Sequence, residues 1–197
     1  MTMKPFHLAL SAGLLLFASC ASTTVRTFAS PADATAAIVA EVDAGNRDEA
    51  SRIFDSFARA SIQRERVYAE LFGTAEQRYG GARYGQAADV LEFLCAKYPG
   101  AVNAREGLVY ARFLERADLG EARPEQTRAM GAAIEDYRSV ASSPSAWVEL
   151  ASVQFAIDEG DLAGARRQFG DFLGSWDGNP PDLMAYVEDL GRYLETH

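Results

Sequence analysis

The chain has 197 residues, of which 48% are hydrophobic and 24% are charged, and this composition is too apolar for an intrinsically disordered protein. The length allows one domain or two small ones, with a core large enough to fold without a disulfide or a structural metal. The formal net charge of −9 disfavours nucleic acid and anionic lipid headgroups as general partners, because both carry negative charge themselves.

The first residues have the pattern of a secretory signal peptide. Lys4 supplies a positive charge, residues 6–17 are apolar and rich in Leu and Ala, and the small residues Ala18 and Ser19 precede Cys20. The apolar stretch is too short for an ordinary membrane span. We therefore predict a signal peptide over residues 1–19.

Residues 17–20, Phe-Ala-Ser-Cys, resemble the bacterial lipobox. The resemblance implies cleavage before Cys20 and acylation of that cysteine, which anchors such proteins to a membrane. Ala21 stands where an Asp favours inner-membrane retention, so for a diderm source the resemblance implies the outer membrane, with the protein facing the periplasm. The alternative is an ordinary secretory signal with an incidental cysteine.

The chain then changes from a small, polar segment to a helical pattern. Residues 20–30 are predicted to form a flexible tether, and residues 31–197 a helical repeat domain. Ser30, Pro31 and Asp33 form a helix start signal, and apolar residues recur at three-to-four spacing with almost no strand pattern. The predicted helices cover residues 31–44, 47 onward, 62–79, 84–97, 103–117, 124–141, 145–159, 161–176 and 181–195. The second and third could be continuous, since the junction at Ala60 and Ser61 carries no strong breaker.

Four of these segments share one arrangement, in which bulky apolar residues follow an alanine by four and seven positions. The alanines are Ala50, Ala87, Ala133 and Ala165, and the bulky residues are Phe54 and Phe57, Leu91 and Leu94, Tyr137 and Val140, and Phe169 and Phe172. The steps between the alanines are 37, 46 and 32 residues, which fits a helical-hairpin repeat of about 34 residues with one insertion in the third unit. Alanine lets two antiparallel helices approach closely, and the bulky residues fill the gap to the next hairpin.

Together with glycine turns at Gly45 and Gly160, with Tyr84 and with Pro99 beyond its helix, this arrangement resembles the tetratricopeptide repeat family. The resemblance implies an all-α fold of antiparallel helical hairpins stacked as an array, with the segment from Pro181 onward as the C-terminal capping helix. The competing interpretation is a compact helical domain in which alanine and phenylalanine simply mark core faces.

Residue types that common active sites need are scarce. After removal of a signal peptide the one histidine is His197, the last residue, so neither a Ser-His-Asp or Cys-His arrangement nor a zinc site is expected. Cys95 lies in an apolar helix and is interpreted as a buried core residue without a disulfide partner. No carboxylate pair stands out among the many acidic residues, which are interpreted as solvated helix faces. We predict a protein that is not an enzyme and that needs no cofactor or metal.

One basic strip is a candidate site. Arg105, Arg112 and Arg116 are seven and four residues apart, so they share one face of a predicted helix. The family resemblance implies that the first helix of each repeat lines a groove, where such arginines hold a partner's carboxylates. The alternative is a solvent face whose arginines pair locally with Glu115 or neighbouring acids. Trp147 is interpreted as a core residue.

We therefore expect a non-catalytic, lipid-anchored scaffold that binds a protein or peptide in the bacterial envelope. The layout is similar, at the level of repeats, to the tetratricopeptide lipoproteins of outer-membrane β-barrel assembly. Two alternatives stay open: an accessory component of small-solute transport, and an envelope enzyme that cleaves glycans with carboxylates. A scaffold needs an open groove with polar and aromatic lining, a transport accessory needs a closed apolar cavity or a pore, and an enzyme needs two facing acids in a cleft.

Overall fold

A computed structural model describes residues 27–118, 120, 123–143 and 145–197 of the chain. The predicted signal peptide and the predicted lipidation site at Cys20 lie outside the described residues, as does most of the predicted tether. Over the described ranges the chain is all-α, with one short 3-10 helix and no strand. This confirms the all-α part of the predicted fold class. None of the described helices combines the length and the apolar character that a membrane crossing requires.

The helices agree with the predicted ranges to within one residue at almost every end. They are α1 (Pro31–Asp43), α2 (Arg47–Phe57), α3 (Ser61–Gly80), α4 (Tyr84–Lys97), α5 (Val102–Asp118), α6 (Pro124–Val140), α7 (Ala146–Asp158), α8 (Leu162–Ser175) and α9 (Met184–Thr196), with the 3-10 helix η1 (Pro181–Leu183) before α9. The chain leaves the helix between Phe57 and Ser61, so α2 and α3 are separate helices and the alternative of one continuous helix is wrong. One detail differs from the predicted ranges: the last segment begins with a 3-10 turn rather than an α-helix.

Polar side chains cap two of the helices, at Ser30 and at Asp161. At α1, Ser30 Oγ accepts a hydrogen bond of 3.1 Å from the backbone N–H of Asp33, and Pro31 occupies the first helical position. At α8, Asp161 accepts a hydrogen bond of 2.8 Å from the backbone N–H of Gly164. Each cap satisfies an amide group that has no partner within the helix.

Three turns between consecutive helices have the same backbone geometry. Gly45, Ala82 and Gly160 each take a positive φ, of 76°, 53° and 82°. In each turn the following residue donates its N–H to the carbonyl five residues earlier, at 2.8 to 2.9 Å, which closes the preceding helix in a Schellman motif. The next helix begins two residues after the positive-φ residue. Five residues after it lies a fully buried alanine of the repeat pattern: Ala50, Ala87 and Ala165.

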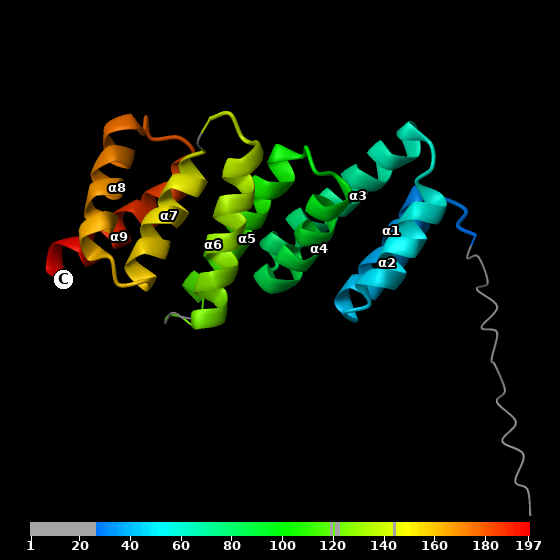
Figure 1. Ribbon diagram of the computed structural model, residues 1–197, viewed down its shortest axis with the longest axis horizontal. Helices are drawn as coiled ribbons and strands as arrows, with labels where there is room; N and C mark the ends of the chain where they lie inside the picture. The colour runs from blue at the N-terminus through cyan, green and yellow to red at the C-terminus, as the bar shows by residue number, and fades with distance from the viewer. Residues whose placement is uncertain (1–26, 119, 121–122, 144) are drawn as a thin grey trace, which may run out of the picture.

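The helices follow one another along the long axis of the molecule, from α1 at one end to α8 and α9 at the other (Figure 1). Each of α1, α3, α5 and α7 packs against the helix that follows it, and α1 also contacts α3, α4 contacts α5, α5 contacts α7, and α6 contacts α7. Helix α9 packs against α8. The buried apolar side chains form one continuous core along this array.

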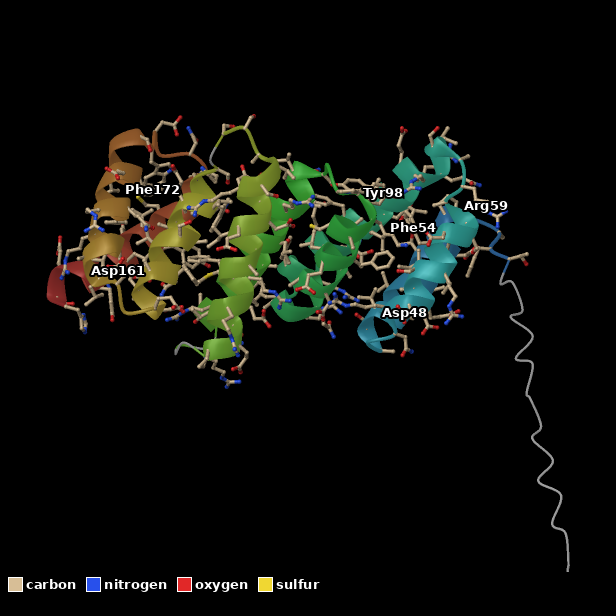
Figure 2. All side chains as sticks on the ribbon, in the orientation of Figure 1. Asp48, Phe54, Arg59, Tyr98, Asp161 and Phe172 are labelled. Atoms are coloured by element: carbon tan, nitrogen blue, oxygen red, sulfur yellow. The ribbon has the colours of Figure 1, made fainter. Side chains whose placement is uncertain are left out.

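The bulky residues of the repeat pattern are mostly in the core. Phe54 and Leu91 are fully buried and Phe172 is 2% exposed. Phe54 and Tyr98 lie together at the end of the molecule that holds α1 and α2, and Phe172 lies at the opposite end, on α8 (Figure 2). Val140 is the clear exception, with 36% of its surface exposed, because it is the last residue of α6 and the chain turns away there. The inward position predicted for Val140 is therefore wrong.

Candidate functional site

The three arginines that the sequence singles out lie on α5, and each is held by an acid on another helix. Arg105 is buried, and its Nε lies 2.9 Å from an Asp136 carboxylate oxygen on α6. The Nε–H of Arg105 is not directed at that oxygen, so this contact is an ion pair rather than a hydrogen bond.

Arg112 and Arg116 make stronger links between helices. Arg112 donates to Glu92 on α4 and, at 2.7 Å, to Glu115 on α5. Arg116 donates two hydrogen bonds, of 2.8 and 2.7 Å, to Asp158 at the end of α7. The side chain of Asp158 is 1% exposed. Burial lowers the pKa of Arg112, but the hydrogen bonds that it donates to Glu92 and Glu115 outweigh burial and raise that pKa. The hydrogen bonds that Arg116 donates to Asp158 raise the pKa of Arg116, also against burial, so both arginines stay charged.

This placement limits how the arginine strip can serve a partner. A carboxylate from outside would have to displace an acid that already neutralises the guanidinium group, and the displaced acid would be left without its partner. The partner-binding role of Arg105, Arg112 and Arg116 stays a prediction, and their visible effect is to tie α5 to α4, α6 and α7.

A second surface is more open. Four half-buried aromatic rings and one buried ring run across α3, α5, α7 and α9, and we call this set the aromatic row: Tyr79, Tyr110, Phe113, Trp147 and Tyr186. The ring centroids are 5.2 Å apart between Tyr79 and Tyr110, 4.3 Å between Tyr110 and Trp147, and 5.9 Å between Trp147 and Tyr186. The ring of Phe113, the buried member of the row, has its centroid 6.1 Å from that of Trp147 and 5.2 Å from that of Tyr186. Trp147, interpreted as a core residue, thus packs on the core with one side and stays partly open on the other.

Backbone contacts hold one end of the aromatic row in place. The hydroxyl of Tyr79 donates a hydrogen bond of 2.7 Å to the carbonyl oxygen of Gly107. A Cβ at Gly107 would lie only 3.1 Å from that hydroxyl, so a glycine lets α3 and α5 come this close. Burial is the main cause that raises the pKa of Tyr79, which keeps the hydroxyl protonated as the donor.

The other end of the aromatic row opens into a cavity of about 620 Å³ between α5, α7 and α9. Its walls include Phe113 and Tyr186 of the row, and its polar groups include the Arg116–Asp158 pair and Asp189. We call it the α9 cavity. Its volume lies within the range of roughly 300–1,000 Å³ that is common for ligand pockets, and its lining mixes aromatic, aliphatic and charged side chains.

The remaining candidates for chemistry lie elsewhere. Cys95 is buried on α4, and burial raises the pKa of its thiol to about 11, so it is protonated at neutral pH. His197 is exposed at the end of the chain and stacks on Tyr193. Among the residues that the structure describes, no three His, Cys, Asp or Glu side chains lie close enough together to hold a metal ion.

The sequence did not single out the aromatic row, although it contains a sign of it. Tyr79, Tyr110, Trp147 and Tyr186 follow one another at 31, 37 and 39 residues, close to the steps between the repeat alanines. One aromatic residue per repeat on the first helices would have indicated a shared face. Comparisons with protein-family models, with curated proteins and with solved structures find no significant match to this chain.

Proposed function

We propose that this protein is a non-catalytic, lipid-anchored scaffold that binds a protein or peptide partner in the bacterial envelope. The aromatic row carries the proposal. Tyrosine and tryptophan are the residue types that supply most binding energy in protein interfaces, because they bury a large area and lose little conformational freedom. The half-buried rings come from four separate helices and follow one another over the length of several repeats. A partner that lies across the array could contact all of them.

The finer architecture in this proposal is a tetratricopeptide-like array of stacked hairpins. Its support is the repeated turn, in which a positive-φ residue precedes a buried alanine by five residues at Gly45, Ala82 and Gly160. In such arrays the first helices of the hairpins line one face, and the aromatic row lies on α3, α5 and α7, which hold these positions, with α9 as the capping helix. The third hairpin departs from the pattern, because α6 begins nine residues before Ala133.

The membrane anchor in this proposal is acylated Cys20, in the outer membrane and facing the periplasm. Its support is the lipobox-like ending at residues 17–20. Replacement Cys20→Ser removes the acylation site, so we expect the protein to move from the membrane pellet to the soluble fraction of lysed cells. Continued tight association of the Cys20→Ser protein with membranes would show that the anchor is something else.

A second candidate function has one observation in its favour. The α9 cavity, at about 620 Å³, is large enough for a small organic molecule, as an accessory protein of small-solute transport would need. In this case the ligand would be a solute inside the cavity, and the aromatic row would serve packing alone.

Chemical crosslinking in the native envelope, followed by identification of the captured species, separates the two functions. If the protein is a scaffold, we expect a defined protein partner to be captured. The double variant Tyr110→Ala with Tyr186→Ala should then lose most of the crosslinked partner, whereas the control Glu135→Gln on α6 should capture as much as the wild-type protein. Absence of a protein partner, together with a small molecule that co-purifies with the wild-type protein, would contradict the scaffold and favour transport.

A further inference from the structure

We infer that the aromatic row and the α9 cavity receive a lysine- or arginine-rich peptide segment of the partner. This inference rests on the proposed scaffold function and adds the charge of the partner to it.

The aromatic row offers four half-buried rings to a partner. A cation within about 6 Å of an aromatic centroid is attracted to the electron-rich face of the ring. At the other end of the molecule this arrangement is already complete, since Arg64 and Lys97 each lie 5.2 Å from the centroid of Phe54. Over the described residues, no lysine or arginine lies above any ring of the aromatic row. Four of these rings, those of Tyr79, Tyr110, Trp147 and Tyr186, are partly exposed, so a cation from outside can approach them, whereas Phe113 is buried.

Acidic side chains lie beside the same rings. The pKa values of Tyr110 and Tyr186 are raised, first by burial and further by the nearby carboxylate of Asp182. Glu76 acts in the same direction on Tyr79, again after burial. The carboxylates of Asp182 and Glu76 therefore favour a positively charged partner at the row and disfavour an acidic one.

The α9 cavity has the same preference. Arg116 is the one cation among its described lining residues, and both ends of the Arg116–Asp158 contact are satisfied by two hydrogen bonds. Asp189 is left with a single exposed ion pair to Arg192, at 3.3 Å, and such pairs contribute little. A long basic side chain fits this lining, because its methylene stem can lie against Tyr186 and Leu190 while its charged head reaches Asp189.

The net charge of the chain also favours a basic partner over an acidic one. The formal net charge is −9, and the arginines of α5 that could attract an acidic partner are already paired within the molecule. An acidic peptide would meet like charge on the row and find no free guanidinium group on α5.

Selection of a displayed library of random ten-residue peptides by the purified full-length chain in detergent tests the inference. We expect the selected peptides to be enriched in lysine and arginine, and a synthetic peptide from this set to bind more weakly as salt is raised. The double variant Asp182→Asn with Asp189→Asn should bind that peptide with an affinity lower by about threefold or more. The matched pair Glu135→Gln with Asp171→Asn, which removes the same charge from exposed positions on α6 and α8, should leave affinity nearly unchanged.

The possible results separate the inference from the function on which it rests. Selected peptides that are acidic or neutral, yet lose binding when Tyr110 and Tyr186 are replaced by Ala, would overturn the basic partner and leave the scaffold standing. Equal weakening by both charge pairs would overturn it as well, because the effect would then come from net charge alone. Failure to select any peptide that depends on Tyr110 and Tyr186 would contradict both proposals.

Discussion

At the scale of single residues, the arginines of α5 show what a sequence pattern can and cannot predict. The spacing of Arg105, Arg112 and Arg116 predicts that the three side chains share one face of a helix. This prediction requires only the helical period. Their partners lie on α6, α4 and α7, and no local rule indicates which acid a folded chain brings to each guanidinium group. The three ion pairs between helices therefore depend on the tertiary packing, which the spacing of the arginines does not predict.

Arg116→Met should destabilise the protein by about 3 kcal/mol, because Asp158 would be left as a buried, unpaired carboxylate. The control is Arg192→Met, whose ion pair to Asp189 has both side chains about 70% exposed and should contribute well under about 1 kcal/mol. Urea unfolding of the two variants measures the difference. Equal stabilities would show that the Arg116–Asp158 contact is not a structural tie.

The neighbouring carboxylates of Asp89 and Glu92, both close to Arg47 and Arg112, should affect the stability of the fold in opposite ways as the pH changes. Burial raises the pKa of Asp89 above its ordinary value of 3.8, against the effect of Arg112. Burial also acts on Glu92, but hydrogen bonds from Arg47 and Arg112 outweigh it and lower the pKa of Glu92 below its ordinary value of 4.5. The ionised form of Glu92 therefore stabilises the fold above that value, whereas the ionised form of Asp89 destabilises it at neutral pH.

Glu92→Gln should thus lower stability at pH 7 by about 1–2 kcal/mol, and this loss should shrink as the pH falls below 4.5 through the lowered pKa of Glu92. Asp89→Asn should raise stability slightly at pH 7, and this gain should vanish below 3.8, where Asp89 is protonated in both states. Thermal unfolding between pH 3 and pH 7 measures both. Effects of the same sign for the two variants would contradict this assignment.

At the scale of elements, the sequence predicts the helices well and the special turn positions less well. Capping residues such as Ser30 and Asp161 and the glycines at 45 and 160 carry strong local signals, and the helices begin and end where these residues indicate. The end of α3 is different. Gly80 and Gly81 are the residues that the sequence would favour for a left-handed turn, but the positive φ belongs to Ala82.

The repeated turn gives a matched test on one helix pair. Gly160→Ala forces a side chain into a left-handed conformation, since φ is 82°, and should destabilise the protein by about 1 kcal/mol. Gly170→Ala lies within α8, where a Cβ meets open space, and should stabilise it by about 0.5–1 kcal/mol. Denaturant unfolding measures both, and a stabilising Gly160→Ala would contradict the role given to this turn.

At the scale of the whole molecule, the period of the sequence carries more information than any single motif. Buried alanines at 50, 87, 133 and 165 indicate stacked helices, and the aromatic residues at 79, 110, 147 and 186 recur at similar steps. This recurrence indicates a shared face, but the ring contacts themselves could not be predicted from the sequence, because they depend on the angle at which each helix packs against its neighbours. The order of the helices along the array (Figure 1) brings residues more than thirty positions apart into ring contact.

The most direct measurement of the central claim, that a partner lies on the aromatic row, is site-specific photo-crosslinking in living cells. A benzophenone amino acid placed at Tyr110 or Tyr186 is compared with the same group at Glu135 on α6 or Gln168 on α8, which are exposed positions outside the row. We expect one protein partner to be captured from both positions of the row and from neither control position. Capture from Glu135 or Gln168, with none from the row, would contradict the account.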